Sequence, residues 1–525
     1  MKLNIFGDIN KYYLQTLCML FCPGAKFADK NKDFDDGDGQ DFEATFTRED
    51  VRGLESDYII VSCLFEKDGR QGLGTWYERV GGNSVWLGSA DGDSKPDDRA
   101  CKLAAGRAAL EAGKELFDII PSWGVLTGIR PAKLASEILN APRPDDPTKT
   151  NTVTAVKSLL TSQFRLSPAK AALAVDIAKN EQKIARLVRS GKSPTCSVYI
   201  SIPFCPSRCA YCSFVSYTSK KLLSLVPDYL TKLIVDITRT FEYIRERGFR
   251  VVTIYIGGGT PTTLDEEGLE LLLAAISDSV DVTKLAEFTL EAGRPDTVTK
   301  RKLEIARTFG VTRMSINPQT MSDEILRGIG RRHSVDDFYR AYTLAKNSGI
   351  RIINTDLIAG LPGDDYDGFS YSIDKIIALD PENVTVHTFC VKKSAEILKI
   401  DTEIYNRSAD ETVKAVNYSQ VRLQNALYKP YYIYRQKNTV GNLENVGFAK
   451  KGMEGLYNVL MMEELHTIFA VGAGAVTKLV KCDPDGKKQI KRIFEPKYPY
   501  EYLAASGESL SDKLSEADNF FGFSN

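Results

Sequence analysis

Six apolar runs alternate with helical patterns between residues 197 and 390, and this regularity constrains the fold more than any other feature of the chain. The runs lie near 197–202, 250–256, 286–291, 311–316, 350–358 and 382–388. The stretch from Asp228 to Arg247 is typical of the segments between them, because its large apolar residues recur on one helical stripe. Repeated strand–helix units indicate a parallel sheet, and six of them make an incomplete barrel. The sequence therefore predicts an α/β fold with a partial (β/α)6 TIM-like barrel core.

Alternate residues within these runs differ in polarity. One face carries aliphatic residues and Phe288, which are suited to packing beneath helices. The opposite face holds Tyr199, Ser201, Thr253, Tyr255, Thr289, Glu291, Arg313, Ser315, Asn317, Asn354, Asp356, Thr385 and His387. Because a closed eight-stranded barrel fills its interior with bulky aliphatic side chains, a polar interior predicts a lumen that holds water or a ligand.

A loop with three cysteines follows the first run. Cys205, Cys209 and Cys212 lie in the stretch SIPFCPSRCAYC, with no fourth ligand at the spacing of a zinc finger. Three thiolates on one loop predict a four-iron cluster with one iron open to a small molecule. Zinc and a disulfide are the alternatives, although zinc prefers four ligands and disulfides concentrate in small secreted domains. Ten cysteines without a disulfide-like framework, three of them needed as thiolates, place the chain in a reducing cytoplasm.

Further motifs fall where the other runs end. The run GGGTP at 257–261 follows the second strand, and Glu291 ends the third. Gln319 follows the fourth strand, Arg331 opens the helix after it, and Asp356 lies near the end of the fifth. Each is compatible with an ordinary turn or a satisfied buried polar group. Because parallel strands share one carboxyl edge, their convergence favours a ligand site.

The rest of the chain suggests flanking regions around this core. A hairpin signature at Asp68-Gly69 and a helical pattern to Phe117 indicate an α+β domain. The predicted divisions are an N-terminal α+β domain over 1–140, a linker and helical segment over 141–193, the core over 194–400, and a C-terminal α/β extension covering the substrate over 401–525. With 68 basic and 69 acidic residues, no general nucleic-acid surface is expected, and no apolar run is long enough to span a membrane.

The cysteine loop, the GGGTP run and DLIAGLPG at 356–363 together resemble the radical SAM superfamily, in the branch of oxygen-independent coproporphyrinogen III oxidases. Outside the core, GVLTGIRP at 124–131 and GNLENVG at 441–447 are similar to its HemZ-type subgroup. The resemblance implies a [4Fe-4S] cluster whose open iron binds S-adenosylmethionine (SAM). One electron then yields methionine and a 5′-deoxyadenosyl radical. That radical takes a hydrogen from a propionate of coproporphyrinogen III. The substrate radical then loses carbon dioxide and passes its remaining electron to an acceptor, which leaves a vinyl group.

The resemblance also implies residue roles and partners. Cys205, Cys209 and Cys212 would bind the cluster, and Tyr199 and Glu291 would be catalytic. The implied cofactor contacts are Tyr199, Tyr211, Gly258, Gly259, Thr260, Glu291, Gln319, Arg331, Asp356 and Phe389. Tyr211 would shield the cluster, and the fork of Arg331 suits a carboxylate. The expected partners are a tetrapyrrole and a low-potential electron donor of the flavodoxin or ferredoxin type.

Several alternatives stay open. The protein is alternatively a haem-binding or trafficking protein of the HemW type, or a radical SAM methyltransferase acting on a tetrapyrrole. The chain also departs from the family pattern, with Ser201 in place of a frequent histidine and Phe214 in place of a further cysteine. His387 and His466 are candidates to bind the iron of haem, or else are structural residues. A set of aromatic and cationic residues either contacts a flat tetra-acid or forms an aromatic strand with a charged turn: Tyr428, Lys429, Tyr431, Tyr432, Tyr434, Arg435 and Lys437.

Overall fold

A computed structural model describes most of the chain. The described residues are 2–5, 11–21, 43–53, 56–79, 96–127, 130–143, 146–189, 193–212, 216–390, 409–436, 439–483, 488–505 and 507–523. They form two compact units. The N-terminal unit comprises 1–179, 405–409 and 433–444, and the barrel unit comprises 180–404, 410–432 and 445–525. The four divisions expected from the sequence stay a prediction.

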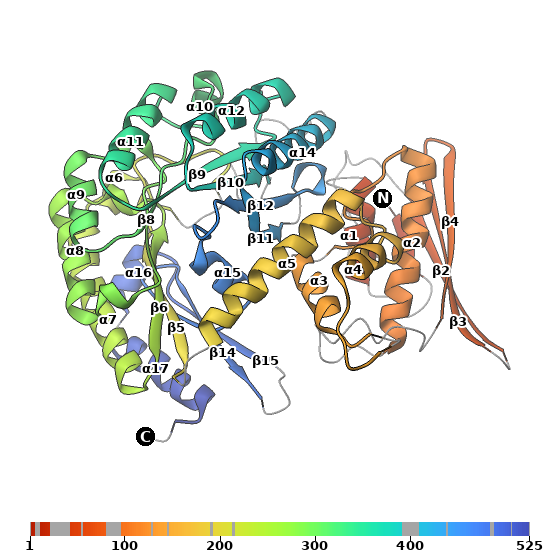
Figure 1. The fold of residues 1–525 in the computed structure, drawn as a ribbon, viewed down its shortest axis with the longest axis horizontal. Coiled ribbons are helices and arrows are strands. Elements are labelled where there is room, and N and C mark those ends of the chain that lie inside the picture. The colour runs from red at the N-terminus through yellow and green to blue at the C-terminus, as the bar shows by residue number, and fades with distance from the viewer. Residues whose placement is uncertain are drawn as a thin grey trace. The chain divides into compact units, whose positions relative to one another are not determined.

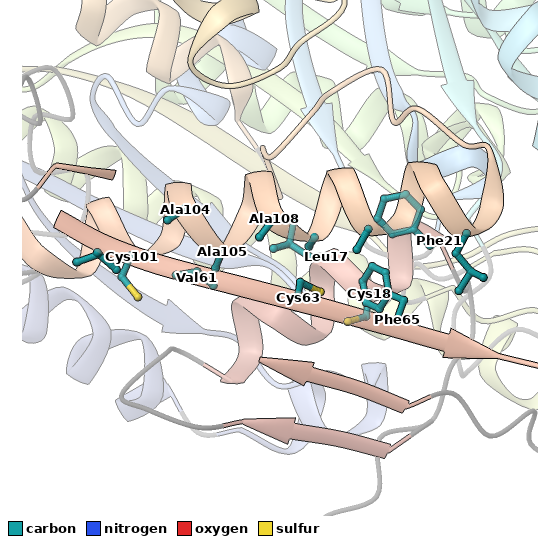
Figure 2. Close-up of a cluster of buried hydrophobic side chains, with 14 residues drawn as sticks. Leu17, Cys18, Phe21, Val61, Cys63, Phe65, Cys101, Ala104, Ala105 and Ala108 are labelled. Carbon is teal, nitrogen blue, oxygen red and sulfur yellow. The ribbon is translucent and has the colours of Figure 1, made fainter. Parts of the chain in front are cut away.

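The N-terminal unit contains a four-stranded sheet in the order β1-β2-β3-β4. Its elements are β1 (Lys2–Ile5), α1 (Lys11–Phe21), β2 (Glu43–Gly53), β3 (Ser56–Lys67), β4 (Arg70–Arg79), α2 (Pro96–Phe117), α3 (Pro131–Asn140), α4 (Val153–Ser162) and the start of α5 (Pro168–Arg189). Figure 2 shows apolar side chains of α1, β3 and α2 gathered into one core. Gly74 lets α2 approach the sheet, since a Cβ there would lie 2.0 Å from the Ala108 carbonyl oxygen. The predicted hairpin and helix are both present.

Residues of, or next to, the two segments that resemble the HemZ-type subgroup make buried polar contacts inside the N-terminal unit. Glu444 is central, because its carboxylate accepts a hydrogen bond from Trp123 Nε1 and pairs with Lys170 Nζ, each at 2.6 Å. Arg435 Nη1 donates to the Leu126 carbonyl at 2.5 Å. Lys170 and Glu444 are both buried, so neither charge is tolerable without the other.

The barrel unit contains an eleven-stranded sheet in the order β11-β12-β10-β9-β8-β7-β6-β5-β13-β14-β15. Six consecutive parallel strands form its centre: β5 (Thr195–Ile202), β6 (Arg250–Gly258), β7 (Glu287–Glu291), β8 (Arg313–Ser315), β9 (Ile352–Ala359) and β10 (Asn383–Thr388). Helices line the outer side of these strands in Figure 1. Those helices are α7 (Val226–Glu246), α8 (Glu266–Ser279), α9 (Lys300–Thr308), α10 (Asp323–Gly328), α11 (Val335–Asn347) and α12 (Tyr366–Leu379). The predicted α/β fold with a partial barrel is confirmed.

The C-terminal part of the chain extends both edges of this sheet. On one edge are β12 (Glu444–Ala449), antiparallel to β10, and β11 (Lys429–Arg435). On the other edge are β13 (Thr467–Val471), β14 (Val476–Cys482) and β15 (Lys488–Phe494). The remaining α-helices of the described residues in this unit are α6 (Lys220–Leu223), α14 (Ala409–Asn425), α15 (Leu456–Met462), α16 (Pro499–Ala504) and α17 (Gly507–Phe521). Among the described residues, no helix has the length and apolar character needed to cross a membrane.

The interior of the partial barrel is polar, as the alternation predicts. Asn354 Nδ2 donates to Ser315 Oγ at 3.2 Å, and Thr385 Oγ1 donates to Asn354 Oδ1 at 3.3 Å. The hydroxyls of Ser197 and Thr253 lie 2.6 Å apart. These groups satisfy one another across neighbouring strands, which is how buried polar side chains avoid the cost of lost hydration.

Helix α15 lies at the amino end of β7. Glu287, the first residue of that strand, accepts hydrogen bonds from the backbone N–H groups of Leu456 and Tyr457 at 2.8 and 3.1 Å. Arg313 Nε lies 3.2 Å from the same carboxylate. A negative charge at the first turn of a helix is favourable because it faces unpaired N–H groups.

The structure overturns two ligand-binding interpretations. Tyr428 and Tyr431 are almost fully buried, and their hydroxyls donate to Pro381 O and Asn383 Oδ1 at 2.5 and 3.2 Å, so they offer no face to a tetrapyrrole. Among the other aromatic and cationic residues between 428 and 437, Tyr432 is also buried and Tyr434 is half-buried. Lys437 lies outside the described residues.

His466 is the second correction. Its Nδ1 lies 3.0 Å from Thr195 Oγ1 and its Nε2 lies 2.8 Å from Ser197 Oγ. Burial lowers the pKa of its imidazole to about 3, so the ring stays neutral. Because both ring nitrogens are hydrogen-bonded inside the sheet, His466 is a structural residue and the haem-ligand interpretation is wrong.

Candidate active site

The cysteine loop leaves the carboxyl end of β5 and is fixed by backbone hydrogen bonds to other segments. Cys205 N donates to the Tyr217 carbonyl at 3.1 Å, and Ala210 N donates to the Ile329 carbonyl at 3.0 Å. Cys205 is buried, whereas Cys209 and Cys212 are half-buried. The loop therefore has a defined conformation with its thiols next to the ends of the strands.

Each of the three sulfurs lies near a polar side chain. Thr260 Oγ1 lies 3.3 Å from Cys205 Sγ, and Arg294 Nη1 donates to Cys209 Sγ at 3.6 Å. The third contact joins the Ser216 hydroxyl to the Cys212 sulfur, at 3.8 Å. Hydrogen bonds of this kind stabilise the thiolate form that iron requires.

Without a metal, the thiolate of Cys205 is unfavourable. Burial raises its pKa to about 11, although the hydrogen bond to Thr260 opposes the shift. Among the described residues, no three His, Cys, Asp or Glu side chains converge closely enough to hold a single metal ion. A cluster with several irons binds each thiolate on a different iron, so it does not need that convergence.

The glycine run at the end of β6 packs directly against the cysteine loop. Gly258 has a left-handed φ of 112°, and a Cβ on Gly259 would lie 2.5 Å from the Phe204 carbonyl oxygen. Gly259 N donates to Ile202 O and Thr260 N donates to Phe204 O, each at 2.8 Å. The backbone N–H groups of these two implied cofactor contacts are therefore bonded to the protein itself.

Two carboxylates near the same edge have opposite environments. Glu291 accepts a short hydrogen bond from Tyr255, but burial raises its pKa to about 7 and the charge of Asp356 adds to the shift. Burial also opposes the charge of Asp356, yet its pKa lies below the usual value because His387 and Asn354 favour the anion. Environments that separate two carboxyl pKa values are typical of acid–base and binding sites.

Asp356 is held by three side chains on neighbouring segments. Asn317 Nδ2 and Asn354 Nδ2 donate to its two oxygens at 2.7 and 2.8 Å. His387 Nε2 lies 3.7 Å from Oδ2. These contacts fix the orientation of the carboxylate, so a ligand that binds it meets a preformed acceptor.

Three tyrosine rings stack inside the barrel unit. The Tyr255 and Tyr457 centroids are 4.5 Å apart with planes at 25°, and Tyr199 lies 6.1 Å from Tyr255 and 6.2 Å from Tyr457. Burial is the main cause that raises the pKa of all three phenols, which are thus neutral at physiological pH. Tyr457 comes from α15 in the C-terminal part of the chain.

Arg331 lies behind the cysteine loop. Its Nη1 donates to the carbonyls of Gly293 and Asn317 at 3.1 and 2.8 Å, and Nη2 contacts the Tyr211 hydroxyl at 3.5 Å. Its Nε is buried with no partner among the described residues. Part of the fork is therefore engaged by the protein, whereas the Nε group is not.

Gln319 and Phe389 complete the residues singled out from the sequence. Gln319 has a left-handed φ of 72°, and its backbone N–H donates to the Asp356 carbonyl at 3.0 Å. Its Oε1 is buried and has no partner within the described part of the chain. A buried acceptor left unpaired is costly unless a ligand supplies the donor. Phe389 is buried directly after β10, where its N–H donates to the Ala359 carbonyl at 2.9 Å.

Arg294 and Tyr457 were not predicted as site residues. Arg294 is buried, donates to Ser207 Oγ at 2.8 Å, and so ties the cysteine loop to the segment after β7. Its position three residues after the end of β7 is a sequence feature that could have marked it as a site residue. Nothing in the sequence marks Tyr457, because its contacts depend on where α15 packs.

Comparisons with known proteins found similar sequences and structures. The model of the radical SAM superfamily matches residues 199–376. The chain is 35% identical over 404 residues to the oxygen-independent coproporphyrinogen-III oxidase-like protein HemZ of Bacillus subtilis, covering 77% of this chain and 78% of that protein. It is 31% identical over 332 residues to the heme chaperone HemW of the same organism, covering 62% of this chain and 82% of that protein. Among solved structures, coproporphyrinogen III oxidase (HemN) from Escherichia coli matches with a TM-score of 0.48 and 17% identity, over 63% of this chain and 73% of that one.

A three-cysteine loop at the carboxyl edge of a partial barrel, together with the match to the superfamily model, defines a radical SAM protein. Members of this superfamily use a [4Fe-4S] cluster and SAM. Within it, the chain belongs to the family of oxygen-independent coproporphyrinogen III oxidase-like proteins.

Proposed function

We propose that the protein is a radical SAM oxidoreductase, a coproporphyrinogen III dehydrogenase of haem biosynthesis. It would convert propionate groups of coproporphyrinogen III to the vinyl groups of protoporphyrinogen IX without oxygen. The observation that carries the proposal is the grouping of three hydrogen-bonded thiols with Glu291 and Asp356 at the ends of polar-faced strands. The family membership supports it.

The residues present fit the cofactors of the superfamily. In this proposal Cys205, Cys209 and Cys212 bind three irons of the cluster, because each sulfur already has a neighbour that favours the thiolate. When bound, the cluster supplies the electron that cleaves the sulfonium of SAM. Tyr211 shields the cluster from water, and Gly258, Gly259 and Thr260 keep the SAM site close to it.

The polar groups around the cysteine loop would orient SAM. The Nε edge of Arg331 suits its carboxylate, and Gln319 Oε1 accepts a hydrogen bond that the protein leaves unmade. Asp356, which is preoriented and ionised, suits the ribose hydroxyls, and Phe389 suits the adenine ring. Glu291, with its pKa near 7, holds or releases a proton beside Tyr199 and Tyr255.

A haem-binding function of the HemW type is the second candidate. The observation that favours it is the 31% identity to HemW, because the match covers 82% of that protein. The proposed compartment is the reducing cytoplasm for either function. The nine cysteines in the described part of the chain are all free thiols, which agrees with that compartment.

Anaerobic reconstitution followed by product analysis tests the proposal. The reduced protein, supplied with SAM and coproporphyrinogen III, should release 5′-deoxyadenosine and carbon dioxide in equal amounts and form vinyl groups. Cys209→Ala is the matched control, and it should form none of these products. Tight haem binding with little SAM cleavage in the wild-type protein would instead favour the HemW-type function.

A further inference from the structure

One half-buried and two exposed tyrosines form a patch beside the cysteine loop. We define the tyrosine patch as Tyr217, Tyr498 and Tyr500. The ring centroids of Tyr217 and Tyr498 are 5.6 Å apart, and those of Tyr498 and Tyr500 are 5.3 Å apart. Tyr500 is 51% exposed and Tyr498 is 37% exposed. Large rings that gather on a surface while remaining exposed are typical of interaction sites.

The tyrosine patch is joined directly to the cysteine loop. The carbonyl of Tyr217 accepts the hydrogen bond from Cys205 N at 3.1 Å, and Tyr217 N donates to the Pro203 carbonyl at 2.8 Å. Its hydroxyl donates to the Lys497 carbonyl at 3.2 Å, which ties in the segment carrying the other two tyrosines. A single hydrogen bond thus separates Tyr217 from a residue proposed to bind the cluster. Short bonded paths of this kind favour electron tunnelling.

Two cations and one carboxylate lie beside the tyrosine patch. Arg208 is exposed, precedes Cys209 in the chain, and is near enough to Tyr217 to oppose the rise in its pKa. Lys497 is exposed, with its Nζ 5.8 Å from the centre of the Tyr498 ring. The nearby carboxylate of Glu501 accepts a hydrogen bond from Tyr498 N at 3.3 Å. The face therefore presents aromatic rings and two cations, which complements an acidic partner.

We propose that the tyrosine patch, with Arg208 and Lys497, is the docking surface for the electron donor of the cluster. This inference rests on the proposed function. The partner is a small acidic protein that carries a flavin or an iron–sulfur group of low potential. In the transfer the donor loses one electron and the cluster gains one, and no covalent bond forms or breaks. Such encounters use small, weakly bound interfaces.

Two variants test the surface without touching the proposed cluster or SAM contacts: Lys497→Glu and Tyr500→Ser. The probe is a bacterial flavodoxin, used oxidised to measure association and as its hydroquinone to measure reduction of the reconstituted cluster by stopped flow. Lys497→Glu should slow the second-order transfer roughly tenfold at low salt, and the difference should shrink at high salt. Tyr500→Ser should weaken association several-fold. The matched control is Lys300→Glu on α9, where the lysine side chain is 81% exposed, and it should change neither quantity.

Chemical reduction separates this inference from the proposed function. With dithionite as the reductant, Lys497→Glu and Tyr500→Ser should cleave SAM at the wild-type rate. Unchanged association and transfer in Lys497→Glu, or no association of flavodoxin with the wild-type protein, would overturn the docking surface. Failure of the wild-type protein to cleave SAM with dithionite would overturn the proposed function, while the association measurements would still report on the surface.

Discussion

The two ends of strand β7 carry the same residue type in opposite environments. Glu287, at the amino end, pairs with Arg313 and accepts hydrogen bonds from two backbone N–H groups of α15. Glu291, at the carboxyl end, accepts a hydrogen bond from Tyr255, and burial raises its pKa to about 7. The charge of Glu287 is stabilised by the protein groups around it, whereas burial makes ionisation of Glu291 unfavourable.

This difference distinguishes the amino end of β7, where contacts stabilise the fold, from the carboxyl end, where the candidate active site lies. The contacts of Glu287 join α15 to the amino end of the strand, so the protein itself completes that end. The carboxyl end instead gathers groups that the protein satisfies incompletely: a desolvated Glu291, the unpaired Gln319 Oε1 and the thiol of Cys205 with its raised pKa. Strained or unsatisfied groups concentrate at functional sites.

The largest expected effect sharpens this comparison at the carboxyl end. Cys209→Ala should abolish assembly of the iron–sulfur cluster, because two thiolates on one loop cannot hold it. Iron and sulfide content after anaerobic reconstitution measures the loss, and circular dichroism should show the fold retained. The control is Cys482→Ser, which alters an exposed cysteine of β14 and should leave iron loading unchanged. Full iron loading in Cys209→Ala would contradict the ligand assignment.

The next effect falls on the amino end. Glu287→Gln should lower the free energy of unfolding by about 3–5 kcal/mol, because it leaves the buried guanidinium of Arg313 without its counter-charge. Urea denaturation of the protein without cofactors measures this loss. Glu291→Gln, four residues along the same strand, is the control and should cost far less. Equal losses of unfolding free energy in Glu287→Gln and Glu291→Gln would contradict the difference between the two ends of β7.

The pH dependence of stability tests the raised pKa of Glu291. Its folded pKa of about 7 exceeds the ordinary 4.5, so its contribution is fully present below pH 4.5 and is lost as the pH rises through 7. Between pH 5 and 8 the wild-type free energy of unfolding should fall relative to Glu291→Gln by at most about 3 kcal/mol. Parallel pH profiles for the two proteins would show that this carboxyl titrates normally.

The smallest expected effect is a shift in the reduction potential of the cluster. Arg294→Lys keeps the positive charge but removes the guanidinium that donates to the sulfur of Cys209. Loss of one hydrogen bond, about 1 kcal/mol, should shift the reduction potential more negative by roughly 40 mV. A redox titration followed by EPR measures the shift, and Arg301→Lys on the exposed side of α9 is the control. An unchanged potential would leave Arg294 with only a structural role in the loop.

Much of the barrel unit follows from the sequence, because period-two alternation and helical stripes depend on local residue order. They predicted all six central strands, the polar interior and the convergence of Glu291 and Asp356. The sequence did not predict the environments of those two carboxylates. They depend on which side chains from other strands come within hydrogen-bonding reach, such as Asn317 for Asp356 and Tyr255 for Glu291.

The errors have the same physical origin. Tyr428 and Tyr431 have the composition of a ligand surface, but both are buried, and their hydroxyls bond to Pro381 and Asn383 from a distant part of the chain. The N–H groups of Gly259 and Thr260, two of the implied cofactor contacts, are bonded to the carbonyls of Ile202 and Phe204. Long-range packing, which no local pattern encodes, decided each of these cases.

The EPR spectrum of the reduced, anaerobically reconstituted protein, recorded with and without SAM, tests the central claim most directly. The three-thiolate site predicts iron and sulfide in the protein and a spectrum that changes when SAM binds the open iron. A protein that contains zinc in place of iron and sulfide, or a cluster spectrum unaffected by SAM, would contradict it.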